Sequence, residues 1–202
     1  MTKIKLCGLS RPCDIEAANA LRPEYIGFVF AQKSKRYVEV NVAAQLKRML
    51  LPDIRAVGVF VDAPCEEVAD LLRQNIIDVA QLHGHEDEAY IRKLRTLAGR
   101  PIIKAFRVQS QQDMEAANAC SADYVLLDSG AGTGTTFDWN IIKNMRRLYF
   151  LAGGLEIGNV KTAVNTLHPF AVDVSSGIET DGVKDKTKMA AFVAAVRKEE
   201  RL

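Results

Sequence analysis

Eight short apolar runs, spaced almost evenly along the chain, limit its possible folds more than any other feature of the sequence. Successive runs start 22 to 25 residues apart, apart from one gap of 30. Continuous apolar character over so few residues is typical of strands buried on both faces of a parallel sheet. The runs read KIKLC, YIGFVF, RAVGVFV, DVAQL, PIIKAF, DYVLLD, LYFLA and FAVDV, and they begin near Lys3, Tyr25, Arg55, Asp78, Pro101, Asp123, Leu148 and Phe170.

Helical patterns fill the segments between these runs. Apolar residues recur at the i, i+3, i+4, i+7 spacing in residues 160–167 and again in residues 189–196. That spacing places apolar side chains on one face of a helix. Ser110 with Asp113 predicts a capped start for the helix after the fifth strand, and Asp185 predicts a cap for the last helix.

The alternation of strands and helices predicts an α/β protein. A closed (β/α)8 barrel and an open doubly wound sheet both satisfy this alternation. Eight near-equal units favour the closed TIM barrel, and a length of 202 residues leaves little room for insertions. No linker rich in proline or serine interrupts the pattern. Residues 1–202 are therefore expected to form a single (β/α)8-barrel catalytic domain.

Charge and composition narrow the range of partners. A formal net charge of +2 argues against a surface that binds nucleic acid. No apolar run approaches the roughly 20 residues that a membrane span needs. The four cysteines form no CxxC pair, and no basic-then-apolar leader is visible. We therefore expect a cytoplasmic protein with reduced thiols that binds neither nucleic acid nor membrane.

A phosphate site is predicted at one end of the barrel. Barrel enzymes place their sites at the C-terminal ends of the strands, and many bind phosphate with the loops after strands seven and eight. Glycines in those loops let backbone N–H groups approach a phosphate, and a short extra helix would add partial positive charge. The alternative is that these glycines only serve tight turns. The predicted phosphate-binding residues are Gly153, Gly154, Ser175, Ser176 and Gly177.

A glycine-rich stretch also follows the sixth strand, in residues 129–139. It would serve as a mobile cover or as a second backbone contact to a ligand. It lacks the GK[ST] ending of a Walker loop, and it stands too late in the chain for a dinucleotide fingerprint. The sequence therefore predicts no nucleotide cofactor.

Cys7 and Asp128 are the predicted catalytic pair. Cys7 ends the first strand and Asp128 ends the sixth, so both side chains can reach the centre of a closed barrel. A base on one flank and an acid on the other would suit proton transfer between two atoms of a substrate. The thiol would need positive surroundings to act as a base, and the carboxyl would need a raised pKa to act as an acid. The alternative for Cys7 is a small buried apolar residue.

Two further polar groups lie near strand ends. Arg36 follows the second strand and can bind a carboxylate through two hydrogen bonds, although its position taken alone favours a solvated basic loop residue. His83 and His85 could indicate a metal, but no convincing set of further ligands accompanies them. No metal site is predicted.

Six sequence motifs, in the same order over nearly the whole chain, resemble those of the phosphoribosylanthranilate isomerase family. Two departures are visible. Leu6 replaces the usual isoleucine, and Asp181 stands where the family commonly has proline, so a looser turn is expected there. The motifs are residues 5–11 (KLCGLSR), 27–30 (GFVF) with Ser34 and Arg36, 81–84 (QLHG) with Glu86, 126–129 (LLDS) with 132–134 and 137–139, 152–155 (AGGL) with Asn159 and Val160, and 173–179 (DVSSGIE) with 182–185.

The resemblance implies a TIM-barrel isomerase of tryptophan biosynthesis, an intramolecular oxidoreductase that needs no metal and no organic cofactor. Its reaction is the Amadori rearrangement of N-(5-phosphoribosyl)anthranilate to 1-(2-carboxyphenylamino)-1-deoxyribulose 5-phosphate. Carried over residue by residue, Asp128 is the general acid and Cys7 the general base. Arg36 would hold the anthranilate carboxylate, and the two glycine- and serine-containing loops would hold the phosphate.

Three other functions remain open. The corresponding isomerase of histidine biosynthesis would more naturally use two aspartates, so Cys7 argues against it. A barrel that only binds a phosphorylated metabolite would keep its phosphate affinity without Cys7 and Asp128. A scaffold domain would carry an exposed apolar patch, which the sequence does not reveal. The expected partner is a small phosphorylated substrate, and the chain is expected to be a monomer or a homodimer.

Overall fold

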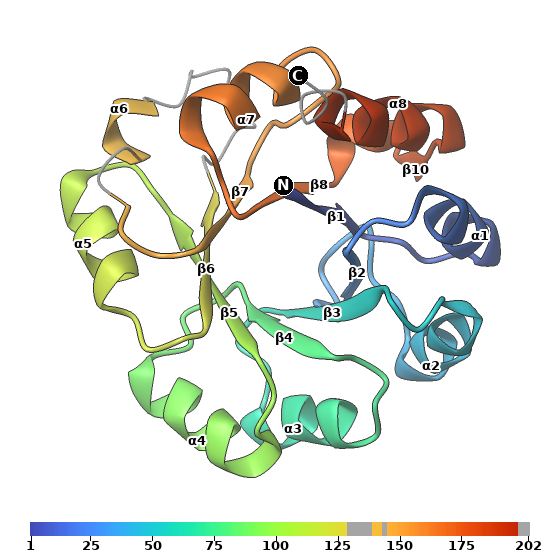
Figure 1. Cartoon of the computed structure of the whole chain (residues 1–202). Coiled ribbons are helices and arrows are strands. Elements are labelled where there is room, and N and C mark those ends of the chain that lie inside the picture. Colours follow the sequence, from blue (N-terminus) through green and yellow to red (C-terminus); the bar gives the residue numbers. More distant parts are fainter. Residues whose placement is uncertain (129–138, 143–144, 198–202) are drawn as a thin grey trace.

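The computed structural model describes residues 1–128, 139–142 and 145–197. At its centre, eight parallel strands close into a barrel in sequence order, and helices surround it (Figure 1). This confirms the predicted (β/α)8 fold and excludes the open doubly wound sheet. Every strand begins within one residue of its predicted start. The strands are β1 (Lys3–Cys7), β2 (Tyr25–Val29), β3 (Arg55–Phe60), β4 (Val79–Leu82), β5 (Ile102–Arg107), β6 (Tyr124–Asp128), β7 (Tyr149–Ala152) and β8 (Ala171–Val174).

The helices bury the faces that their sequence patterns predict. All four apolar positions of each predicted stripe are buried, in residues 160–167 and 189–196. Ser110 and Asp113 form a reciprocal capping box, and one Asp185 carboxylate oxygen accepts hydrogen bonds from the backbone N–H groups of Thr187 and Lys188. The helices are α1 (Pro12–Leu21), α2 (Val40–Met49), α3 (Cys65–Arg73), α4 (Glu88–Ala98), α5 (Gln111–Ala119), α6 (Trp139–Ile142), α7 (Val160–Leu167) and α8 (Lys186–Arg197).

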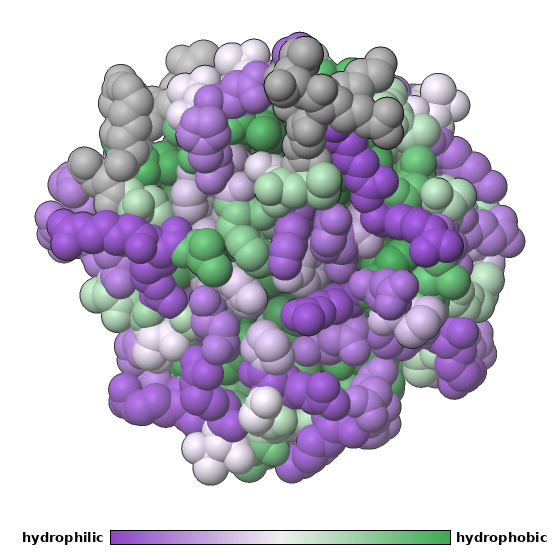
Figure 2. Space-filling view, in the orientation of Figure 1, coloured by the Kyte–Doolittle hydropathy of each residue, from purple (hydrophilic) through white to green (hydrophobic). Residues whose placement is uncertain are grey.

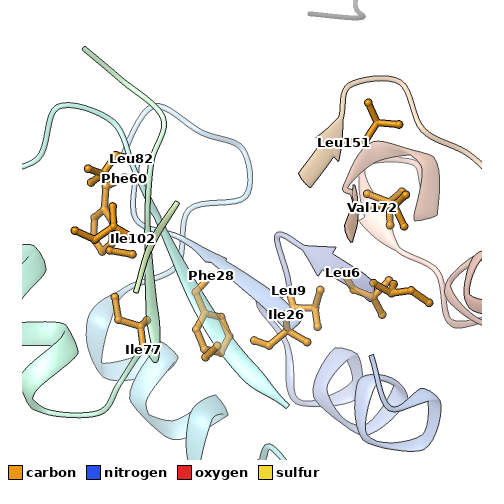
Figure 3. Close-up of a cluster of buried hydrophobic side chains, with 14 of the residues drawn as sticks. Leu6, Leu9, Ile26, Phe28, Phe60, Ile77, Leu82, Ile102, Leu151 and Val172 are labelled. Atoms are coloured by element: carbon orange, nitrogen blue, oxygen red, sulfur yellow. The ribbon is translucent and has the colours of Figure 1, made fainter. Parts of the chain in front are cut away.

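Strand alternation divides the barrel into an outer core and an inner core. Residues such as Leu6, Phe28 and Leu82 point outward and join a large apolar cluster with the helices (Figure 3). Their neighbours along each strand point inward, because successive side chains of a strand face opposite sides. A second apolar cluster fills the interior and contains Tyr25, Val57, Val79, Ile103, Leu126, Phe150, Ala152 and Ala171.

A small hairpin follows β8. A three-residue 3-10 helix, Ser176–Ile178, leads into β9 (Glu179–Thr180), which pairs antiparallel with β10 (Val183–Lys184). Both residues between these strands, Asp181 and Gly182, have positive φ, at 52° and 78°. Two positive values are characteristic of a type I′ turn, for which Asp-Gly is a preferred sequence. The expectation of a looser turn at Asp181 is therefore replaced by a tight hairpin of defined geometry.

Hydrophilic residues cover most of the face seen in Figure 2, and hydrophobic residues appear there in small separate areas. Among the described residues, no helix is long and apolar enough to span a membrane.

Candidate active site

The C-terminal ends of the strands surround a cavity of about 370 Å³. It brings together seven of the eight residues predicted to form the site. Residues from β1, β6, β7 and β8, and from the loop after β2, all line this one space. The seven are Cys7, Arg36, Asp128, Gly153, Gly154, Ser175 and Ser176.

Gly177 is the predicted site residue that does not line the cavity. It lies in the 3-10 helix, where an added Cβ would come within 2.1 Å of the Leu155 carbonyl oxygen. Only glycine fits so close to another backbone segment. Its visible role is to let the loops after β7 and β8 pack against each other, next to the cavity.

Cys7 is buried at the last position of β1, with 8% of its surface exposed. Its sulfur lies over Gly27 of β2, where an added Cβ would stand 2.6 Å from Sγ. The missing side chain at Gly27 therefore creates the space that the thiol occupies. Burial raises the pKa of the Cys7 thiol above its ordinary value, and the positive charge of Lys5 opposes this effect.

Lys5 and Asp173 form a buried ion pair at the site that the sequence did not reveal. Lys5 is fully buried inside the barrel, and its Nζ lies 2.8 Å from Asp173 Oδ2. Asp173 lines the cavity. Strand alternation offered a signal, because Lys5 stands two positions before Cys7 and so faces the same side. A lysine in the middle of an apolar run pointing into a barrel interior is unusual enough to be noted.

Asp128, at the end of β6, has His83 of the loop after β4 as a neighbour. His83 Nε2 lies 3.5 Å from Asp128 Oδ2, and Gln81 Nε2 lies 3.0 Å from His83 Nδ1. Gln81 and His83 both line the cavity. The interaction with Gln81 fixes the imidazole ring beside the carboxylate. In the sequence, His83 stood within a family motif, and metal binding was the one chemical role considered for it.

The histidines of the sequence HGH do not converge on a common point. His85 pairs with Asp62, at 2.9 Å, on the exposed rim of the barrel, whereas His83 faces Asp128. Within the described residues, no three or more His, Cys, Asp or Glu side chains are grouped so that they could hold a metal ion.

Arg36 is held by a carboxylate from the hairpin after β8. Its Nε and one terminal nitrogen donate to the two oxygens of Glu179, at 2.6 and 2.8 Å. Lys184 also binds Glu179, at 2.5 Å. Burial alone would raise the pKa of Glu179, but the hydrogen bonds from Arg36 and Lys184 hold it below its ordinary value. Arg36 is thus a fixed, half-buried group at the cavity and not a solvated loop residue. Glu179 and Lys184 were present only as parts of a motif in the sequence.

The loop after β7 contains two residues whose backbone conformation favours glycine. Gly153 and Gly154 have φ values of 89° and 63°. Asn159 Nδ2 donates to the Gly154 carbonyl at 2.8 Å and so fixes this loop to the start of α7. Gly153 and Gly154 line the cavity together with Ser175 and Ser176. The glycine-rich loop of residues 129–138, predicted as a cover or second contact, lies outside the described residues.

Comparison with known proteins places this geometry in a family. The family model described as N-(5'-phosphoribosyl)anthranilate (PRA) isomerase matches residues 4–195. The N-(5'-phosphoribosyl)anthranilate isomerase of Endomicrobium trichonymphae is 42% identical over 202 residues, which cover 98% of this chain and 99% of the relative.

Solved structures agree with the sequence relatives. The phosphoribosyl anthranilate isomerase of Thermotoga maritima superposes with a TM-score of 0.89 at 35% identity, covering 98% of this chain and all of the other. A phosphoribosyl anthranilate isomerase in complex with reduced 1-(o-carboxyphenylamino)-1-deoxyribulose 5-phosphate superposes with a TM-score of 0.86 at 34% identity, with the same coverage. On the family match and on the near-complete alignment with these relatives, the chain belongs to the N-(5'-phosphoribosyl)anthranilate isomerase family.

Proposed function

We propose that the protein catalyses the Amadori rearrangement of N-(5-phosphoribosyl)anthranilate with Cys7 as general base and Asp128 as general acid. The observation that carries this assignment is the single cavity in which a thiol, a carboxyl group, a fixed guanidinium and two glycine- and serine-containing loops meet. The reaction follows from membership of the family. The cavity contains groups suited to protonating the ring oxygen, to removing a proton from the sugar, and to binding the carboxylate and the phosphate.

The proton transfers divide between the two sides of the cavity. Asp128 on β6 protonates the furanose ring oxygen, and the ring opens to a Schiff base. Cys7 on β1 then removes the proton from C2′. The resulting enolamine tautomerises to the ketone, so the substrate and the product have the same atoms. An acid and a base on separate strands can act on different substrate atoms without neutralising each other.

The two ends of the substrate carry negative charge and need different partners. Arg36 can bind the anthranilate carboxylate with the guanidinium N–H groups that Glu179 leaves free, since a guanidinium has five donors. Backbone groups of Gly153, Gly154, Ser175 and Ser176 would hold the phosphate, with Gly177 supporting their loops. Chemistry would take place between these two anchors, which fix the sugar relative to Cys7 and Asp128.

A fluorescence assay tests the assignment. Phosphoribosylanthranilate is generated in place, and the loss of its fluorescence is followed with the wild type, Cys7→Ser and Asp128→Asn. Fast turnover by the wild type is expected, with each variant slower by about a hundredfold or more, as expected for loss of a general acid or base.

Other outcomes would separate function from mechanism. Absence of wild-type turnover would reject the assignment and bring forward the analogous substrate of histidine biosynthesis. Turnover that survives both substitutions would keep the isomerase function and reject the assigned roles. Phosphate affinity without any turnover would point to a binding protein.

The remaining proposals concern the chain as a whole. We propose that residues 1–202 act as one catalytic domain, in the cytoplasm, as a monomer or a homodimer with a small phosphorylated substrate as its partner. Light scattering of the purified protein during gel filtration would distinguish the monomer from the dimer.

A further inference from the structure

Lys5 stands directly behind Cys7 in the barrel. The two residues lie two positions apart on β1, so their side chains face the same side of the strand. Lys5 is fully buried, and Cys7 has 8% of its surface exposed. Lys5 is in register with Asp173 on the neighbouring strand β8. The cation thus lies inside the barrel and binds Asp173, which lines the proposed active site.

The ion pair between Lys5 and Asp173 leaves one carboxylate oxygen without a hydrogen-bond partner among the described residues. One ammonium proton binds Asp173 Oδ2 at 2.8 Å, and the positive charge of Lys5 also acts on the Cys7 thiol. The carboxylate oxygen without a partner, Oδ1, is buried. A buried ion pair contributes little to stability even when all its groups are satisfied. A stabilising role therefore explains this incomplete pair poorly.

The two other positive charges near Cys7 both form ion pairs with the same carboxylate. Arg36, from the loop after β2, and Lys184, from β10, both interact electrostatically with the thiol, but both are held by Glu179. On the far side of the cavity, Asp128 of β6 has His83 as its neighbour. Lys5 is the buried cation two positions before Cys7, on the same face of β1.

We propose that Lys5 is a positioning residue that holds a fixed positive charge against Cys7 and so favours the thiolate, while Asp173 opposes this effect and holds Lys5 in place. The proposal rests on the proposed role of Cys7 as the general base. It assigns a function to two buried charged residues that the proton-transfer steps do not use directly. It also explains how a thiol shielded from solvent can lose its proton.

The two substitutions have opposite expected effects on Cys7. A thiolate, and not a thiol, displaces iodide from iodoacetamide to form the thioether, so the reaction rate reports the thiolate fraction. Lys5→Met removes the favourable charge while keeping an unbranched side chain. Asp173→Asn removes the opposing charge while keeping the shape of the carboxylate.

The experiment measures the alkylation rate of Cys7 in the free protein between pH 6 and pH 10. A Cys13→Ala background leaves one thiol in the tryptic peptide that contains Cys7, and mass spectrometry then quantifies its modification. At pH 7, we expect Lys5→Met to react about tenfold more slowly or worse and Asp173→Asn to react faster, because each unit of thiol pKa changes the thiolate fraction tenfold. The midpoint of the pH profile should move up in the first variant and down in the second.

Lys3→Met is the matched control. Lys3 lies on the same face of β1, at the opposite end, with its ammonium 4.5 Å from the centre of the Phe170 ring. Its loss should leave the alkylation profile unchanged. Lys5→Arg should restore most of the reactivity, since it keeps the charge.

Two results would overturn the proposal. One is an unchanged profile in Lys5→Met, and the other is a shift of Lys5→Met and Asp173→Asn in the same direction, which indicates altered packing. If Lys5→Met fails to fold, the test depends on Asp173→Asn. Slower alkylation of Cys7 in that variant than in the wild type would then reject the proposal. Alkylation needs no turnover, so a protein without isomerase activity could still show both changes in the alkylation rate. Failure of this proposal can therefore be distinguished from failure of the proposed isomerase function.

Discussion

The two ends of the barrel interior are built from the same strands but carry different side chains: aromatic residues at one end and polar residues at the other. At the N-terminal end, Phe150 makes edge contacts with Tyr25, Tyr124 and Phe170 at centroid distances of 5.3, 5.8 and 5.7 Å. At the C-terminal end, the inward positions carry Cys7, Asp128 and other polar groups around a cavity. One end gains stability from close packing, and the other leaves a cavity lined by polar groups that a ligand can fill. The comparison predicts that substitutions at the first end change stability and that those at the second change activity.

Phe150→Ala should have the largest effect on stability. The ring is fully buried among three aromatic neighbours, and removing such a ring costs about 3–5 kcal/mol. Urea unfolding would measure the loss, while turnover per folded molecule at low temperature should change little. A large loss of activity with unchanged stability would break the division between the two ends.

Asp181→Pro should destabilise the hairpin after β8. Proline fixes φ near −65°, whereas residue 181 has φ of 52°, so the turn cannot form as it stands. We expect a loss of roughly 1–3 kcal/mol, as for other incompatible proline substitutions. Thermal unfolding measures the effect. Asp181→Asn is the control, because asparagine accepts positive φ, and it should behave like the wild type.

Glu179→Gln should separate binding from chemistry at the polar end. The substitution removes the charge that orients Arg36 and compensates Lys184. We expect KM to rise about tenfold, which corresponds to ~1.4 kcal/mol, with a smaller change in kcat. Steady-state kinetics provide the measurement. A fall in kcat at constant KM would instead indicate that Glu179 takes part in chemistry.

The same residue predicts a pH dependence of stability. The folded-state pKa of Glu179 lies below its ordinary value of 4.5, so its contribution is fully present above pH 4.5 and is lost as the pH falls through the lower folded value. Melting temperatures recorded from pH 6 downward should therefore drop less in Glu179→Gln than in the wild type. Parallel curves for the two proteins would contradict this assignment.

Ser110→Ala should have the smallest effect. Ser110 Oγ accepts a hydrogen bond from the backbone N–H of Asp113 at the start of α5, on the outside of the barrel. Loss of such a cap costs about 1 kcal/mol. Chemical unfolding should detect this loss with turnover unchanged, and any change in kcat would show that the outer helices influence the site.

The sequence by itself determined the fold and the strand limits, and it selected seven residues that line the cavity. Eight apolar runs predicted where the strands begin, because continuous apolar character is typical of strands that are buried on both faces. The rule that barrel sites lie at the C-terminal strand ends then selected Cys7, Asp128 and the loops near Gly153 and Ser175. Local signals also sufficed for the capping box at Ser110.

Only the tertiary structure decided which charges meet. Lys5 and Asp173 lie on the first and last strands and become neighbours when the barrel closes. Arg36 and Glu179, from opposite ends of the chain, form their two hydrogen bonds for the same reason. Sequence periodicity reports which face a residue occupies, but the partner across that face depends on closure and register. Many of the residues that line the cavity can therefore be predicted from the sequence. The ion pairs among them depend on how the barrel closes.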